Sequence, residues 1–252
     1  YKKYNRTNLS KMTTYSIIIP CRDEEVNVKI ISSNILQNCK YSDYEIIFIN
    51  DYSNDDTEEN LVQLTQKYKN ISYFNNQEKG LGGAIKLGLE KSKGDYITIL
   101  MADSADSIDD LNSYFEMIKE NQFDAIFGSR FIRGGKTVDY PIIKLLLNRF
   151  GNYLTKILFL SDYDDFTNSF KIYKRNVVNH FYPIVSEDFN IFLELPLKTI
   201  SRGFKYKIVP IKYYNRTIGE AKFKIKELGS RYMFTLLYCF LEKVLLKKKN
   251  KF

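Results

Sequence analysis

Short apolar runs alternate with helical patterns along the first half of the chain, and this alternation constrains the fold more than any other feature. The runs at residues 15–20, 44–50, 71–74, 94–100 and 124–128 are expected to be strands. Segments with apolar residues at helical spacing separate them. Strands joined by helices form parallel sheets with helices on both faces. We therefore predict a doubly wound, mostly parallel α/β sheet.

The second half of the chain has a different pattern. Residues 141–160 read as one long apolar helix, 166–173 as strand-like, 175–181 as a short helix and 206–213 as a strand. Ser186, Glu187 and Asp188 are expected to cap a helix that runs to about Ser201. We divide the chain into a flexible leader (1–14), a main domain (15–222) and an amphipathic, basic-ended C-terminal helix (223–252).

Charge and cysteine usage narrow the class of protein. The formal net charge is +8 and the isoelectric point is near 9.1, which favours anionic partners such as phosphates or an anionic membrane. No nucleic-acid motif is present, so nucleic-acid binding is not expected. The three scattered cysteines predict neither a disulfide framework nor a zinc site, and the single His180 is expected on a helix surface. No signal peptide is evident, and Met12 is a candidate start.

Two carboxylates, Asp103 and Asp106, follow the strand at residues 94–100, with small neighbours that leave room for a ligand. Ligands of open α/β sheets bind just past the carboxyl ends of the strands. Carboxylates suit a hard cation such as Mg²⁺ or Mn²⁺, which in turn suits a diphosphate. The alternative is that both residues only form a turn and a helix N-cap. The residues by themselves leave these two interpretations open.

Four loops, in order, now resemble those of one family. They are Ile-Ile-Ile-Pro-Cys-Arg-Asp-Glu at 17–24, Asn-Asp-Tyr-Ser-Asn-Asp-Asp-Thr at 50–57, the Asp103 turn, and Gly-Ser-Arg at 128–130. Together they resemble family 2 inverting glycosyltransferases with the GT-A fold. Arg-Thr-Ile-Gly-Glu-Ala-Lys at 216–222 resembles the loop of dolichol- or polyprenyl-phosphate sugar synthases. The resemblance covers about residues 15–240 and implies transfer of a sugar from a nucleotide-diphosphate sugar to a polyprenyl phosphate.

The resemblance implies a donor site at the strand ends. The nucleotide-contacting positions it assigns are Pro20, Arg22, Glu24, Asp51, Ala102 and Asp103. For Asp51 the alternative is turn chemistry alone. The glycines at 80, 82 and 83 could cradle a phosphate at a helix N-terminus, but we favour plain packing for them.

The metal motif departs from the family pattern. Asp103 matches the second aspartate of the Asp-x-Asp motif, whereas Met101 takes the place of the first and Asn50 replaces another common aspartate. Asp106 is the candidate to compensate, so the expected metal ligands for Mg²⁺ or Mn²⁺ are Asp103 and Asp106. With one ligand missing, we predict weak metal binding.

A basic cluster is implied on the acceptor side. Arg130 matches the arginine near the donor phosphates, and Lys144, Arg216 and Lys222 match residues that face an acceptor phosphate. A lipid phosphate is already anionic and needs no general base. If the acceptor is instead a sugar hydroxyl, a carboxylate base is required, with Asp165 as first candidate and Asp188 as second. With a lipid phosphate, Asp165 would be structural or on the acceptor side.

Two other functions remain open at this stage. One is a soluble glycosyltransferase acting on sugar hydroxyls during polysaccharide synthesis, and the other is a nucleotide-sugar-binding protein impaired in catalysis. The helix at 223–246, followed by the lysines at 247–251, is interrupted by Glu242 and Lys243 and is too short to span a bilayer. It predicts a peripheral protein on an anionic cytoplasmic leaflet. The alternative is a helix packed on the core or in a dimer interface.

Overall fold

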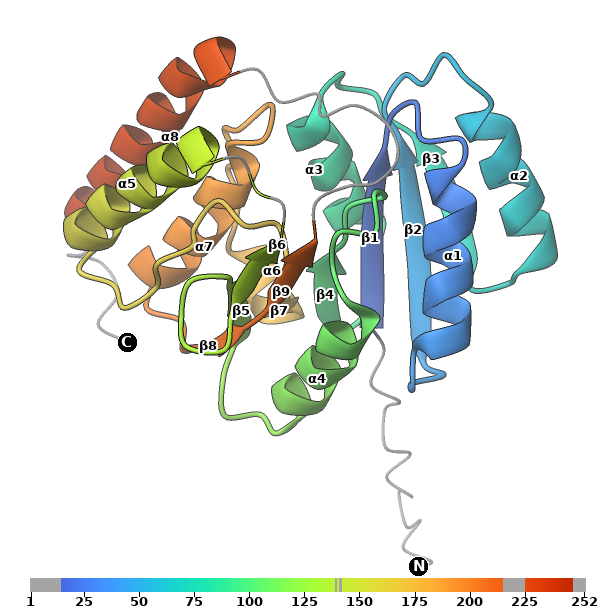
Figure 1. Ribbon diagram of the computed structural model, residues 1–252, viewed down its shortest axis with the longest axis horizontal. Coiled ribbons are helices and arrows are strands. Elements are labelled where there is room, and N and C mark those ends of the chain that lie inside the picture. The colour runs from blue at the N-terminus through green and yellow to red at the C-terminus, as the bar shows by residue number, and fades with distance from the viewer. Residues whose placement is uncertain (1–14, 139, 141, 215–224, 247–252) are drawn as a thin grey trace, which may run out of the picture.

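The computed structural model describes residues 15–138, 140, 142–214 and 225–246 (Figure 1). Its first half alternates strands and helices as predicted. These elements are β1 (Tyr15–Cys21), α1 (Asn27–Asn38), β2 (Tyr44–Asn50), α2 (Thr57–Lys67), β3 (Ile71–Asn75), α3 (Leu81–Lys91), β4 (Tyr96–Ile99), α4 (Ile108–Lys119) and β5 (Ala125–Ser129). The second half contains β6 (Lys136–Val138), α5 (Ile142–Phe159), β7 (Lys171–Lys174), α6 (Arg175–Asn179), α7 (Ile191–Ser201), β8 (Tyr206–Pro210), β9 (Lys212–Tyr214) and α8 (Ile225–Leu246).

Seven strands form one sheet in the order β3-β2-β1-β4-β7-β5-β8. Every pair is parallel except those of β7, which runs antiparallel to both β4 and β5. The predicted mostly parallel, doubly wound sheet is therefore confirmed. Because the parallel strands point the same way, their carboxyl ends, and the polar turns that follow them, meet at one edge.

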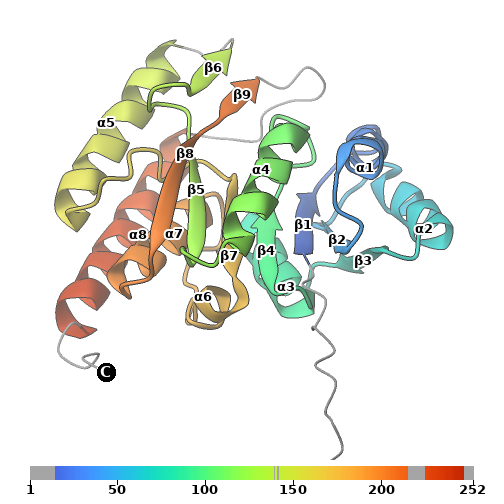
Figure 2. The ribbon, with the colours of Figure 1, turned by 90° about the horizontal axis from the view of Figure 1, so that it is seen from below.

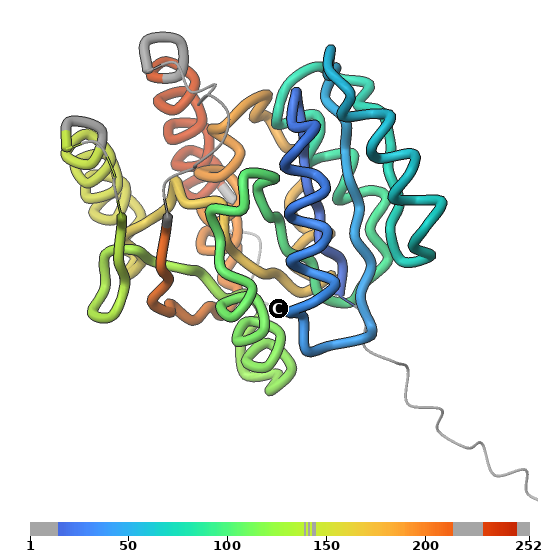
Figure 3. Tube along the Cα trace, turned by 45° about the vertical axis from the view of Figure 1, so that its right-hand side comes forward, coloured from blue at the N-terminus to red at the C-terminus, as the bar shows by residue number. Residues whose placement is uncertain are grey.

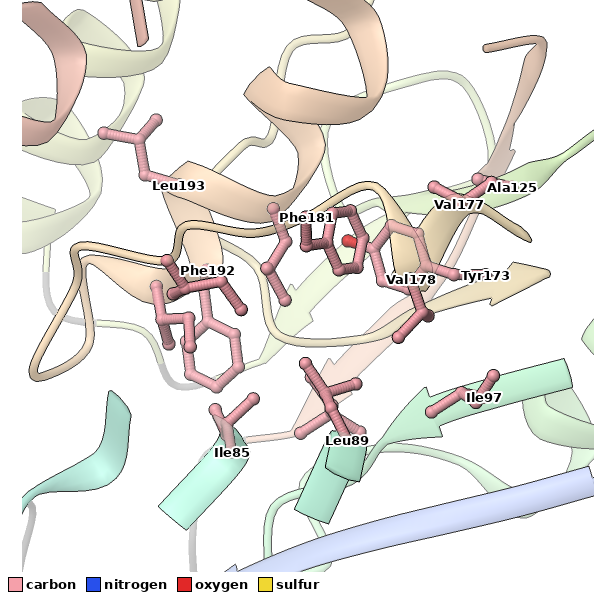
Figure 4. Packing of buried hydrophobic residues seen from close by; sticks show 14 of the residues in the cluster. Ile85, Leu89, Ile97, Ala125, Tyr173, Val177, Val178, Phe181, Phe192 and Leu193 are labelled. Carbon is pink, nitrogen blue, oxygen red and sulfur yellow. The ribbon is translucent and has the colours of Figure 1, made fainter. Parts of the chain in front are cut away.

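Two hydrophobic clusters cover the two faces of the sheet (Figure 2). Alternate residues of β1 show the division: Ile17 and Ile19 pack toward α1 and α4, whereas Ile18 packs toward α3. In the α3 layer, Ile85 and Leu89 lie opposite Phe181 and the α7 side chains, including Phe192 (Figure 4).

Helices α5 and α8 lie next to each other at the end of the molecule away from α1 and α2 (Figures 1 and 3). α8 packs mainly on α7. Its Thr235 is buried and accepts a 2.9 Å hydrogen bond from the Asn190 side-chain amide, and its Cys239 is part of the core. One face of α8 is thus part of the folded domain, as the packing alternative expected. Among the described residues, no helix combines the length and the apolar character needed to cross a bilayer.

Three predicted boundaries in the second half were wrong. The strand expected at 166–173 is confined to β7, because residues 166–170 form a turn in which the Phe166 amide donates to the Asn152 side chain at 2.7 Å. α7 begins at Ile191, not near Ser186, because the Glu194 carboxylate on α7 accepts the Val185 and Ser186 amides.

The third wrong boundary is the strand expected at 206–213. It is divided into β8 in the main sheet and β9, which pairs with β6 in a separate two-stranded ribbon. Two other expectations held: His180 is exposed at the end of α6, and the three cysteines form no disulfide.

Candidate active site

A cleft of about 590 Å³ runs along the carboxyl edge of the sheet. The turns after β1, β2, β4 and β5 all contribute to it, so the predicted convergence of the strand ends is confirmed. The end of β1 and those turns supply Pro20, Cys21, Arg22, Glu24, Asp51, Met101, Ala102, Asp103, Ala105 and Arg130 to its wall. The volume is within the range of small-molecule sites.

Asp51 is held rigidly where β2 ends. Its Oδ1 accepts hydrogen bonds from the Asn76 side-chain amide (2.7 Å) and the Gly80 backbone amide (2.9 Å), and its Oδ2 lies 3.9 Å from Arg22. The carboxylate is buried and therefore has a fixed orientation in the cleft wall. Asp51 thus organises its turn, as the turn alternative expected, and it also lines the cleft, whereas its contact with a nucleotide stays a prediction.

The glycines before and in the first turn of α3 are required by packing. Gly80 has φ +121°, and a Cβ at Gly82 would collide with the backbone of Ser186 and Glu187. The Gly82 amide donates to the Glu187 carbonyl at 2.9 Å. Because this amide is already bonded to protein, the packing interpretation is favoured over a phosphate cradle.

In the turn after β4, Asp103 and Asp106 do not cap the following helix. The N-cap of α4 is Ser107, whose hydroxyl accepts from the Asp110 amide, so neither Asp103 nor Asp106 has that role. Ser104 has a positive φ of 57°, a conformation unfavourable for a residue with a Cβ. Asp103 lines the cleft, and its Oδ1 accepts from the Ala105 amide at 3.2 Å.

Asp106 is buried and only partly satisfied. Its Oδ2 has no hydrogen-bond partner, which is unusual for a buried carboxyl. Burial, and secondly the nearby Asp103 carboxylate, raise the pKa of Asp106 to about 7. A buried carboxyl with an unpartnered oxygen is stabilised either by a bound proton or by a bound cation.

These two carboxyls fit a divalent cation only in part. The unpartnered Asp106 oxygen beside Asp103 is suitable for Mg²⁺ or Mn²⁺, both of which prefer oxygen ligands. No group of three or more potential metal ligands exists among the described residues. Asp103 lines the cleft, whereas Asp106 is buried behind that wall and is not part of the lining. A cation in the cleft would therefore bind Asp103 first, and phosphate and water oxygens would have to complete the coordination.

The Asp106 pKa predicts a pH-dependent stability of the metal-free protein. Since the folded pKa is above the unfolded value of about 4, the native state binds the extra proton, and unfolding free energy should fall as pH rises from 4 to 7. Asp106→Asn cannot ionise, so in EDTA it should unfold at a higher temperature than wild type at pH 8 and at a similar temperature at pH 5. Parallel melting curves against pH would contradict this assignment.

Arg130 and Asp165 form a buried ion pair at the end of β5. Arg130 Nη2 and Nε lie 2.6 and 2.8 Å from the two Asp165 oxygens, and the Arg130 amide donates to Asp165 at 3.0 Å. Asp165 is fully buried and Arg130 nearly so. Burial alone would lower the pKa of Arg130, but Asp165 outweighs it and the pKa is raised. With both oxygens bonded to Arg130, Asp165 is poorly placed to act as a general base.

Two features of this region were not predicted from the sequence. The rings of Phe131, Tyr140 and Tyr213 surround the Arg130 guanidinium, with ring centroids 5.2–5.6 Å from its Cζ. Lys171 is buried beneath the 165–169 turn and donates to the carbonyls of Phe166 (3.2 Å) and Asn168. Burial lowers the pKa of Lys171 to about 7, although Asp165 opposes the shift. The one sequence signal for this lysine is its position between the apolar residues Phe170 and Ile172.

Among the remaining predicted residues, the structure describes the side chain of Asp188 but not those of Lys144, Arg216 and Lys222. Asp188 lines the cleft before α7 and lies 3.5 Å from Arg231 of α8. Lys144 belongs to the first turn of α5, and its side chain is outside the described structure. Arg216 and Lys222 both lie outside the described residues, as do the 1–14 leader and the lysines at 247–251.

The other half of the cleft is apolar and was not anticipated from the sequence. It extends between α5 and α8, and its walls include Leu147, Gly151, Leu154, Phe189, Phe192, Leu193, Gly229, Met233 and Leu236. Asn148 and Thr167, joined by a 2.8 Å hydrogen bond, line the cleft between the charged and the apolar halves.

Comparison with known proteins gives the site its context. The sequence model of Glycosyl transferase family 2 matches residues 16–181. A dolichol-phosphate mannosyltransferase of Pyrococcus furiosus is 29% identical over 217 residues, which cover 84% of this chain and 60% of that protein. A dolichol-phosphate mannosyltransferase of Saccharomyces cerevisiae is 26% identical over 217 residues, covering 82% and 80%. This chain thus spans about 60% of the length of the archaeal relative.

Solved structures share the fold at low sequence identity. Glucosyl-3-phosphoglycerate synthase from Mycobacterium tuberculosis, in complex with uridine diphosphate, superposes with a TM-score of 0.69 at 14% identity, covering 91% of this chain and 80% of that chain. The same enzyme with Mn²⁺, uridine diphosphate and glucosyl-3-phosphoglycerate gives 0.69 at 15% identity, covering 90% and 80%. At this identity the likeness establishes the GT-A fold alone.

Proposed function

This chain belongs to glycosyl transferase family 2, and we propose that it transfers a sugar from a nucleotide-diphosphate sugar to a polyprenyl phosphate, with inversion at the sugar carbon. The observation that carries the proposal is the two-part character of the cleft. Its polar half, at the strand ends, suits a nucleoside diphosphate, and its apolar half, between α5 and α8, suits a long hydrocarbon chain.

The polar half supports the donor assignment. Asp51 and Arg22 lie at the end of the cleft formed by β1 and β2, where an anchored carboxylate can accept hydrogen bonds from a ribose or a base. Asp103 and Arg130 line the cleft past the ends of β4 and β5, where the diphosphate would sit, and the buried Asp106 belongs to the same turn as Asp103. The relatives named as dolichol-phosphate mannosyltransferases, and the fold relative bound to uridine diphosphate, support the same assignment.

The reaction needs no enzyme nucleophile. The bond between the sugar C1 and the diphosphate oxygen breaks as an acceptor phosphate oxygen bonds to C1 from the opposite side. The acceptor oxygen is already anionic, so positioning replaces base catalysis. We assign this positioning to Lys144, Arg216 and Lys222, while Arg130 faces the departing nucleoside diphosphate. A divalent cation held by Asp103 and Asp106, when bound, would neutralise part of the charge on the diphosphate.

The outer surfaces of α5 and α8 support a membrane-associated protein. Both helices expose large apolar side chains to solvent, which folded proteins rarely do in contiguous patches. On α5 these are Ile142, Leu146, Phe150, Tyr153, Ile157 and Leu158, and on α8 they are Phe234, Leu237, Leu241, Val244 and Leu245. We propose that this α5–α8 surface lies on an anionic cytoplasmic leaflet, at the level of the polyprenyl phosphate head group.

Charge substitutions on the α5–α8 surface should abolish membrane binding. We expect wild type to float with vesicles containing anionic lipid at low salt and less at high salt. Phe150→Glu on α5 and Leu237→Glu on α8 should each reduce the floated fraction by at least about tenfold, since each removes roughly 1.5–3 kcal/mol of apolar burial. Val26→Glu, at an exposed apolar site next to α1 and away from the α5–α8 surface, is the control. Wild type that ignores anionic vesicles would refute the membrane assignment.

One alternative acceptor has a specific observation behind it. Asp188 lines the cleft, and a third of its side chain is exposed, so a sugar hydroxyl could reach this carboxylate as a base. The fully paired Asp165 is the weaker candidate for that role.

The test is a screen of radiolabelled UDP- and GDP-sugars with undecaprenyl or dolichyl phosphate and with neutral sugars, in the presence of Mg²⁺ or Mn²⁺. We expect a labelled product that extracts into organic solvent and whose NMR spectrum shows an inverted anomeric centre. Better transfer to a neutral sugar would favour the alternative, and no transfer from any donor would refute both.

A further inference from the structure

Tyr213 of β9 lies at the charged end of the cleft in a fixed orientation. Its ring centroid is 5.4 Å from Arg130 Cζ, and it meets the Tyr140 ring edge-to-face at 5.8 Å. β9 pairs with β6, with Tyr213 opposite Thr137, so the backbone is held as well. Two aromatic contacts and a strand pairing leave the phenol little freedom.

Tyr213 lines the cleft next to the groups that would surround the donor diphosphate. The charges of Asp103, Arg130 and Asp106 all act on this phenol, and the residue lines the cleft. In the described part of the chain, the Tyr213 hydroxyl makes no hydrogen bond. Arg130, by contrast, already commits Nε and Nη2 to Asp165. The Tyr213 phenol is thus a well-held hydrogen-bond donor next to Arg130, whose guanidinium already uses two nitrogens to bind Asp165.

We propose that the Tyr213 hydroxyl donates a hydrogen bond to the terminal phosphate of the bound nucleoside diphosphate and to the same group as it leaves the sugar. This inference rests on the proposed function. A phenol adds a donor without adding charge, in a place where Arg130 and a cation already balance the phosphates. Because negative charge grows on the leaving oxygen as the C1–O bond breaks, this hydrogen bond is stronger in the transition state than in the ground state.

The role is useful in this chain because Met101 replaces a carboxylate ligand of the expected metal motif. A cation held by fewer protein ligands is bound more weakly, so more of the leaving-group stabilisation must come from protein donors. Tyr213 lies outside all the motifs identified from the sequence.

Tyr213→Phe isolates the hydroxyl, because it keeps the ring against Arg130 and Tyr140. Calorimetric titration with UDP and GDP should show at least about tenfold weaker binding of whichever diphosphate wild type prefers, the effect of losing a hydrogen bond to a charged group. Binding of the matching monophosphate, UMP or GMP, should change less than twofold. The turnover number should fall as well, by more than the rise in KM for the donor.

Tyr73→Phe on β3 is the matched control, since it removes a phenol hydroxyl that lies outside the cleft. Thermal unfolding of Tyr213→Phe should match wild type, which separates a contact with the ligand from a structural role. Equal diphosphate affinity and turnover in Tyr213→Phe and wild type would overturn this inference alone. Failure of wild type to bind either UDP or GDP would overturn the proposed function, and this inference with it.

Discussion

Asp103→Ala is expected to reduce sugar transfer by at least about a thousandfold while leaving the fold intact. Asp103 sits in the turn after β4, faces the cleft, and shares its surroundings with the unpartnered oxygen of Asp106. Removing it takes away the half-buried, cleft-lining carboxylate on which a cation and a diphosphate would assemble. Electrostatic stabilisation of a leaving group contributes factors of this size. Initial rates measured with saturating donor and Mn²⁺ would give the loss.

Asp109→Ala provides the matched control for Asp103→Ala. Asp109 is an exposed carboxylate in the first turn of α4, a few residues further along the chain. Its removal should leave transfer within about twofold of wild type, and both variants should melt within a few degrees of it. Wild-type rates that are unchanged by EDTA would refute the metal assignment, and an active Asp103→Ala enzyme would refute the role of this residue.

Asp165→Asn should destabilise the protein by about 3–5 kcal/mol, the usual cost of leaving one partner of a buried ion pair without its counter-charge. Asp165 is fully buried, and both of its oxygens bond to Arg130. The melting temperature should fall by roughly 10 °C, together with activity. Asp164→Asn changes the adjacent carboxylate, whose arginine partner is half-exposed, and keeps an oxygen that can accept from Ser129. It should therefore cost about 1 kcal/mol or less.

This experiment distinguishes a structural Asp165 from a catalytic base. A base could be neutralised without much loss of stability, so an inactive Asp165→Asn protein with wild-type melting would support catalysis by Asp165 and contradict the ion-pair assignment. The double variant Arg130→Met with Asp165→Leu should recover much of the stability, because a buried pair can often be replaced by apolar residues. It should stay inactive, since Arg130 faces the cleft.

The sequence by itself determined the parts that depend on local periodicity. Alternating apolar runs and helical patterns predicted the order of elements over 15–129 and the parallel sheet. Because parallel strands end at one edge, the same reasoning brought Asp51, Asp103 and Arg130 together without any coordinates. Burial periodicity and strand polarity are properties of neighbouring residues, so they can be read along the chain.

Only the tertiary structure decided what those side chains do. Arg130 and Asp165 are 35 residues apart in the sequence, and this spacing does not predict that both Asp165 oxygens bond to Arg130. The predicted start of α7 near Ser186 was wrong. The Glu194 carboxylate, which is on the helix, accepts hydrogen bonds from the Val185 and Ser186 amides and holds this segment outside the helix. The apolar half of the cleft exists because α5 and α8, distant in sequence, lie side by side. Pairings of this kind depend on how elements pack across the fold. A pattern of neighbouring residues carries no information about which distant segments come into contact.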